Sequence, residues 1–169
     1  MGNGDGKYRM QERGQHSNRS RASKDNFGVR SCGECTLCCK IPRIEDIPKP
    51  SWSYCMHCKV GVGCGIYHKG RPEVCVDFTC NWLIDKNIPD NLRPDKIHMY
   101  AHGGKGDAVV KIMIDDDHPN AINSDAGACL IEGYRSMGNH VIVVTKDIIR
   151  FLCGHGREKP AKLDLDWTL

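Results

Sequence analysis

Cysteine spacing in the first half of the chain constrains its fold more than any other feature. Of the eleven cysteines in 169 residues, nine fall within one stretch of 49 residues. They are Cys32, Cys35, Cys38, Cys39, Cys55, Cys58, Cys64, Cys75 and Cys80. Repeated two-residue gaps let neighbouring sulfurs converge on one ion, which is typical of metal ligands rather than of buried thiols. The sequence therefore predicts a metal-binding core in residues 31–90.

Disulfides are the alternative use of so many cysteines. An odd total and the adjacent pair Cys38-Cys39 do not suit a simple disulfide ladder. In a reducing compartment, dense cysteine indicates metal binding. The disulfide interpretation stays open for a protein that works outside such a compartment.

The chain length suits one compact domain with an attached tail. Residues 1–30 contain seven Lys or Arg, three acidic residues and almost nothing apolar, which predicts a flexible basic arm. Such an arm could attach to nucleic acid or to an acidic protein surface, but a merely solvated tail is the favoured interpretation. No aromatic interleaving or nucleic-acid motif favours the first option.

Membrane insertion and export are not expected. No stretch approaches the roughly 18–20 apolar residues of a membrane span, and the N-terminus lacks the apolar run of a secretory signal. We therefore expect a cytoplasmic protein, or one inside an assembled particle.

Local patterns in residues 31–90 predict how the cysteines are carried. Residues 31–40 suit a loop followed by a helical turn, and three prolines make residues 41–53 an extended connector. Residues 55–64 resemble a metal knuckle, in which His57 is a less favoured ligand than the sulfurs. A short helix from Pro72 would carry Cys75 and Cys80 on one side and apolar side chains on the other. Interleaved basic residues would either offset thiolate charge or face solvent: Lys40, Arg43, Lys59, Lys69 and Arg71.

The sequence pattern of residues 91–169 predicts a small α+β region packed on this core. Two strands, 96–102 and 107–115, flank a glycine-rich turn and form a hairpin. A helix follows over 120–137, with Gly138 as its stop, and then a strand over 140–145 and a short apolar element. The predicted inner face of the helix consists of Ala121, Ile122, Ala128, Leu130, Ile131 and Tyr134. The fold class is therefore α+β, with strand-strand-helix-strand order after an irregular cysteine-rich core.

Other features of the second half have plain interpretations. Residues 103–106 lack the spacing of a phosphate-binding loop. The run from Asp115 to His118 could bind a hard cation, but acidic residues at a strand end more often form a solvated turn. Cys129 and Cys153 are expected to be buried structural thiols. No Cys, His and Asp set indicates a nucleophile.

The cysteine pattern resembles a known family. Cys-x-x-Cys-x-x-Cys-Cys, a proline-rich gap and Cys55-x-His57-Cys58 are followed by Gly63-Cys64, Arg71-Pro72-x-x-Cys75 and Phe78-x-Cys80 with Trp82. This set looks like the YkgJ-type cysteine-cluster family, which is described as a zinc- or iron-chelating domain. The resemblance covers about 50 residues and implies metal chelation by the nine clustered cysteines. Members are often called iron-sulfur oxidoreductases, but the resemblance implies no particular reaction, and the basic arm is not part of it.

Nine sulfurs permit three metal arrangements: two Zn²⁺ sites, one [4Fe-4S] cluster with a Zn²⁺ site, or a three-zinc thiolate cluster. Paired Cys-x-x-Cys knuckles favour two closed zinc sites, which stabilise a structural or binding module and do no chemistry. If the protein is an enzyme, an iron-sulfur oxidoreductase is the expected class, and electron transfer is the related alternative. Further alternatives are a component of a nucleoprotein or viral assembly tethered by its arm, and metal storage or delivery.

Overall fold

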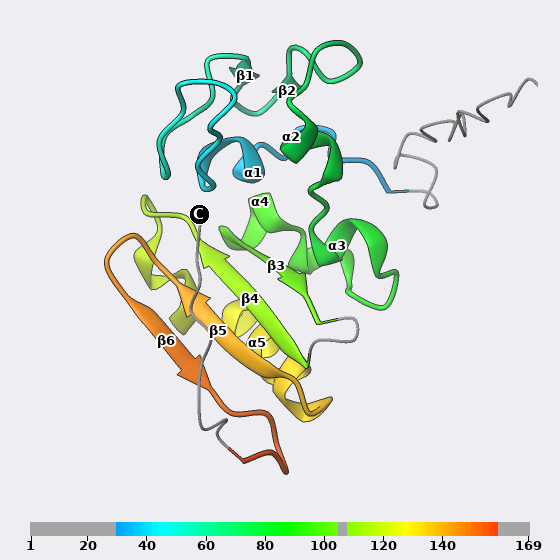
Figure 1. The fold of residues 1–169 in the computed structure, drawn as a ribbon. Helices are drawn as coiled ribbons and strands as arrows, with labels where there is room; N and C mark the ends of the chain where they lie inside the picture. The colour runs from blue at the N-terminus through cyan, green and yellow to red at the C-terminus, as the bar shows by residue number, and fades with distance from the viewer. Residues whose placement is uncertain (1–29, 105–107, 159–169) are drawn as a thin grey trace, which may run out of the picture.

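The computed structural model describes residues 30–104 and 108–158. It is a mixed α+β structure with two sheets and several short helices, as predicted for the fold class (Figure 1). All of the predicted basic arm except Arg30 lies outside the described residues. Within the described ranges, no helix combines the length and apolar character needed to cross a membrane.

The cysteine-rich half consists of short elements joined by turns (Figure 1). They are α1 (Leu37–Lys40), β1 (Cys58–Lys59), β2 (Gly63–Cys64), α2 (Glu73–Asp77) and α3 (Asn81–Ile84). The loop and helical turn predicted over residues 31–40 are confirmed by α1. The connector over 41–53 is less extended than predicted, because Ile44 pairs with Lys49 in an isolated antiparallel bridge.

The single helix predicted from Pro72 is wrong. The chain is extended at Phe78, with ψ of 132°, and at Cys80, with ψ of 154°, so that α2 and α3 are separate helices. Cys75 lies within α2, whereas Cys80 precedes the first residue of α3. The break sets the directions of these two cysteines independently of one another.

The second half contains the main sheet and one long helix. Its elements are η2 (Asp90–Leu92), α4 (Pro94–Ile97), β3 (Met99–Gly103), β4 (Val109–Ile114), η3 (Pro119–Asn123), α5 (Asp125–Ser136), β5 (His140–Val144) and β6 (Ile149–Leu152). The predicted strand-strand-helix-strand order is confirmed, and the short apolar element is a fourth strand.

The long helix starts five residues later than predicted. Ser124 accepts a hydrogen bond from the backbone N–H of Gly127, so it caps α5 and confines Pro119–Asn123 to a 3-10 turn. Gly138, at φ of 79°, follows the helix as predicted. Leu130, Ile131 and Tyr134 are buried, but Ala128 is exposed and does not belong to the inner face.

The four-stranded sheet has the order β3-β4-β5-β6. The outer pairs are antiparallel, whereas β4 and β5 run parallel. A parallel pair needs a crossover connection, which η3 and α5 supply between the two strands.

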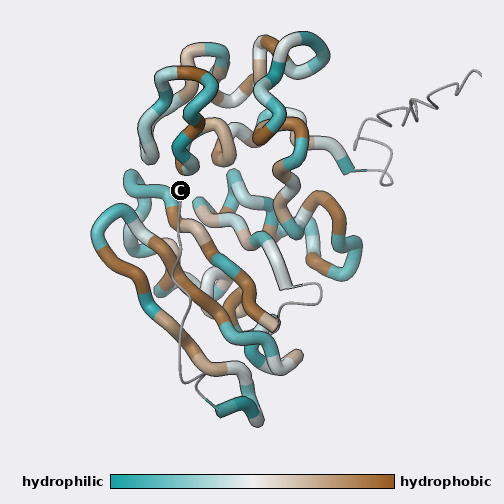
Figure 2. Tube along the Cα trace, in the orientation of Figure 1, coloured by the Kyte–Doolittle hydropathy of each residue, from teal (hydrophilic) through white to brown (hydrophobic). Residues whose placement is uncertain are grey.

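Both faces of this sheet are covered. One face packs Val110, Ile112 and Val143 in a cluster with Leu130 and Tyr134 of α5. The opposite face packs Tyr100, Met113, Ile142 and Val144 against Leu37 and Ile41 from the cysteine-rich half. Burial on two faces explains why every residue of β5 is buried and why hydrophobic colour follows the central strands in Figure 2.

Candidate metal centre

The first four cysteines lie on a tight loop and on α1. The backbone N–H of Cys35 donates to the carbonyl of Cys32 at 2.9 Å, and Gly33 adopts a positive φ of 50° inside that turn. Cys38 and Cys39 are consecutive residues of α1. Consecutive helical side chains point about 100° apart, so this pair can serve two different ligand groups.

The next three cysteines lie on a small hairpin held against α1. The backbone N–H of Cys55 donates to the carbonyl of Cys39 at 3.0 Å, and that of Cys58 donates to the carbonyl of Cys55 at 2.9 Å. Cys58 and Cys64 are paired across β1 and β2. The backbone N–H of His57 lies 3.4 Å from the Cys55 sulfur, which is the knuckle geometry that favours a thiolate.

The thiols influence one another in two sets. In the first set, the charges of Cys32 and Cys35 raise the pKa of both Cys38 and Cys80. We call it the four-sulfur set. Cys39, Cys55, Cys58, Cys64 and Cys75 form the five-sulfur set, in which Cys39 and Cys55 act on the pKa of the other three. The two sets are in contact, because a side-chain hydrogen bond joins Cys38 to Cys39 and is the largest influence on the pKa of both thiols.

Burial governs the protonation of most of these thiols. It raises the pKa of Cys80 to about 11, and burial together with the charge of Cys39 raises the pKa of Cys58 to about 12. Cys39 differs, because hydrogen bonds from Cys38 and Cys58 and the nearby cations Lys49 and Arg71 lower its pKa to about 7. A bound cation would stabilise the thiolate forms of these residues, because its charge would offset both their burial and the repulsion between neighbouring thiolates.

A cavity of about 640 Å³ lies between these segments. All the clustered cysteines except Cys58 and Cys80 line it. Soft sulfur donors of this number around one cavity fit zinc or an iron-sulfur cluster and do not suit a hard cation such as Mg²⁺.

The tightest groups of candidate metal ligands among the described residues lie outside the cysteine cluster. A tetrahedral site with zinc–sulfur bonds of 2.3 Å places its sulfurs about 3.8 Å apart. In the described part of the chain, two sets of three side chains bring all their ligand atoms within 4.8 Å, and neither contains a cysteine. They are His98 with Asp115 and His118, and Asp115 with Asp116 and Asp117.

The prediction that the basic residues offset thiolate charge or face solvent is wrong for Lys40. It is 4% exposed and binds Asp115, Asp116 and Asp117 rather than offsetting thiolates or facing solvent. Burial alone would lower its pKa, but the three carboxylates outweigh that effect and raise it. Lys49 is also buried, and its ammonium donates to the carbonyl of Lys40 at 2.7 Å.

The predicted solvated turn at Asp115 is wrong for the same reason. Asp115 is 5% exposed, whereas Asp117 and His118 are exposed. Sequence gave no signal for this burial, because the partner Lys40 lies 75 residues away. His98, the neighbour of Asp115 and His118, also carried no local signal as a functional residue.

The two remaining cysteines stand apart from the cluster. Cys129 is exposed on α5, so the expectation of a buried structural thiol is wrong for it. Cys153 follows β6 and is half-buried.

Comparison of the chain with protein-family models, with curated proteins and with solved structures finds no match.

Proposed function

We propose that the protein is a metal-binding cysteine-cluster protein in which bound ions stabilise residues 31–90 as a structural or binding module. Membership in the YkgJ-type family is part of this proposal. The observation that carries it is the convergence of the nine cysteines from separate segments of the chain: seven of them line one cavity, and Cys58 and Cys80 act electrostatically with those seven. The four-sulfur set has enough ligands for one closed tetrahedral zinc site. The five-sulfur set has enough for a second site and leaves one sulfur unused.

Energetics support a stabilising role for the ions. Residues 31–90 bury few large apolar side chains, namely Leu37, Ile41, Ile44 and Trp82. Structural zinc supplies on the order of 10 kcal/mol in small modules, which is comparable to the whole stability of a typical domain. Bound ions can therefore hold loops that apolar burial alone would not.

An iron-sulfur protein is the second candidate, and a specific feature favours it. The four-sulfur set consists of a Cys-x-x-Cys-x-x-Cys run, Cys32 to Cys38, completed by the remote Cys80. Such a run with a remote fourth cysteine is the ligand pattern of bacterial [4Fe-4S] proteins.

The test is elemental analysis with a visible spectrum on the full chain prepared without oxygen. Two equivalents of zinc in a colourless protein support the first candidate. Four irons in a brown protein that bleaches on reduction support the second. A protein that retains less than one equivalent of either metal overturns both.

Cysteine variants assign the metals to the two sets. Cys80→Ser is expected to remove the metal of the four-sulfur set and leave the other, whereas Cys75→Ser is expected to weaken only the five-sulfur site. Cys129→Ser is the matched control, because that thiol is exposed on α5. Unchanged metal content in both test variants would contradict the proposed division.

A further inference from the structure

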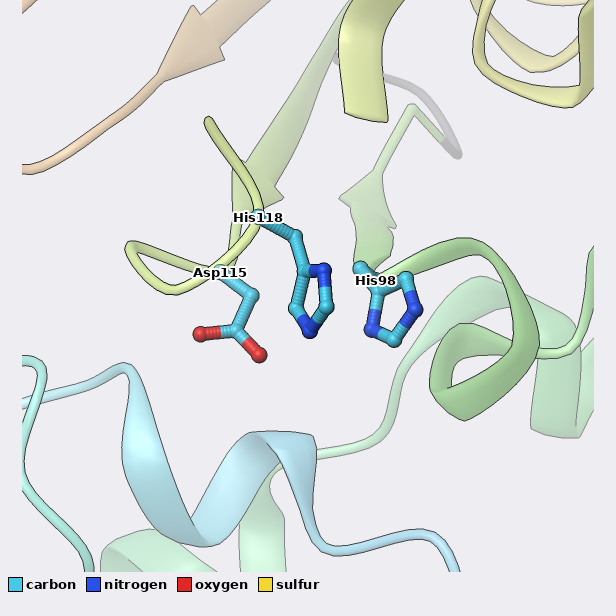
Figure 3. A group of neighbouring side chains, drawn as sticks. All are labelled: His98, Asp115 and His118. Carbon is cyan, nitrogen blue, oxygen red and sulfur yellow. The ribbon is translucent and has the colours of Figure 1, made fainter. Parts of the chain in front are cut away.

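A second group of metal-ligating side chains lies outside the cysteine sets. The ligand atoms of His98, Asp115 and His118 all lie within 4.8 Å of one another (Figure 3). They come from the residue between α4 and β3 and from the turn that follows β4. Sheet pairing brings them together, because Met99 is opposite Ile114 and the residues just beyond that pair are His98 and Asp115.

Backbone hydrogen bonds fix the positions of all three residues. The N–H of Asp115 donates to the carbonyl of His98 at 3.0 Å, and the N–H of His118 donates to the carbonyl of Asp115 at 3.0 Å. His98 has a positive φ of 55°, in the left-handed region that few residues other than glycine adopt. The fold maintains this conformation at the point where the ring meets Asp115 and His118.

The surrounding charge suits a cation. Oδ1 of Asp115 accepts hydrogen bonds from the ammonium of Lys40 and from the backbone N–H of Asp117. Figure 3 shows one carboxylate oxygen of Asp115 directed toward the imidazole rings. Asp116 and Asp117 also pair with Lys40, so three carboxylates surround one buried ammonium. The more exposed Lys146 lies 3.8 Å from Asp116 and offsets only part of the negative charge.

The two imidazoles are stacked, with ring centroids 3.5 Å apart and planes 15° from parallel. In parallel rings the nitrogen lone pairs point alongside one another, so one ion cannot lie in both ring planes. His118 is exposed and can turn its ring toward a shared ion, whereas His98 and Asp115 are held by the surrounding structure.

We propose that His98, Asp115 and His118 form a binding site for one divalent transition-metal ion, separate from the cysteine sets. Two imidazoles and one carboxylate are a ligand set that zinc and non-haem iron accept, and three protein ligands leave coordination positions open to solvent. The site therefore differs in kind from the closed thiolate sites, because an open position can bind water or a small molecule.

The test uses the full chain with its cysteine-bound metal retained and adds Zn²⁺ alone. Imidazole ¹⁵N signals are followed by NMR, which reports on the histidines and not on the thiols. Signals of both His98 and His118 are expected to shift and to saturate at one added equivalent. A shift of neither ring, or of the exposed His118 alone, overturns the proposal.

Variants complete the test. His118→Ala and His98→Asn are each expected to weaken binding more than about tenfold, because even second-shell changes cost roughly 10- to 100-fold. Asn tolerates the left-handed backbone at position 98. His155→Ala is the matched control, since this exposed histidine lies 2.7 Å from Glu132. Affinity unchanged in both test variants would refute the assignment.

Discussion

The ammonium of Lys40 donates a hydrogen bond to the carboxylate of Asp115, and both side chains are buried. Lys40 is the last residue of α1, and Asp115 directly follows β4. This ion pair joins the cysteine-rich half to the end of the main sheet. Asp115 also belongs to the proposed histidine site, so the ion pair links that site directly to α1, the helix that carries Cys38 and Cys39.

Replacing Lys40 with Met is expected to destabilise the protein by about 3–5 kcal/mol, because it leaves the buried carboxylate of Asp115 without its partner. Urea denaturation of the metal-loaded protein measures the effect. Lys146→Met is the control, since Lys146 is 60% exposed and 3.8 Å from Asp116, and a change within about 0.5 kcal/mol is expected. Equal effects of the two substitutions would contradict the importance of the buried pair.

Two glycines of α5 are expected to respond oppositely to alanine. A Cβ at Gly127 would collide with the carbonyl oxygen of Ala121, so Gly127→Ala should cost roughly 1–3 kcal/mol. A Cβ at Gly133 would meet nothing within 4 Å, so Gly133→Ala should stabilise the helix by about 1 kcal/mol. Thermal or urea unfolding of both variants tests the pair. Stabilisation by both substitutions would show that α5 does not pack closely on η3.

Acid should destabilise the protein partly through His102. Burial, and secondarily the charge of Lys111, lowers the pKa of His102 to about 4 from its ordinary value of 6.5. Between these values the unfolded state binds the proton and the folded state does not, so stability falls as pH drops through this window. The loss is expected to reach roughly 2–3 kcal/mol near the lower end.

The measurement is the free energy of unfolding of the wild type and of His102→Gln from pH 7 to pH 4. The variant is expected to lose less stability than the wild type over this range. His155→Gln is the control for removing an exposed histidine, which is 53% exposed. Parallel pH profiles for the wild type and His102→Gln would be inconsistent with a neutral, half-buried His102.

Metal removal should affect the two halves differently. A chelator is expected to remove hydrogen-exchange protection from residues 31–84, because short elements and few apolar contacts hold this segment. Strands β4 and β5 should keep most of their protection, since α5 still covers one face of the sheet. Hydrogen exchange followed by mass spectrometry measures both. Unchanged protection in residues 31–84 after complete metal removal would mean that ions do not stabilise that segment.

The sequence by itself determined the elements that depend on local patterns. Alternating and continuous apolar runs predicted β3, β4 and β5, and the glycines at 103 and 138 marked the hairpin turn and the end of the helix. Cysteine spacing identified the candidate ligands, because two-residue gaps have a local geometric meaning. These signals need no knowledge of distant residues.

Only the tertiary structure decided which distant groups meet. It brought the remote Cys80 near Cys32 and Cys35, broke the predicted helix at Phe78 and buried Lys40 against Asp115. It also brought His98 beside His118 through the register of β3 with β4. The physical reason is that a charge or ligand is defined by its neighbours in space, and chain spacing does not encode neighbours that lie 20 or 75 residues apart.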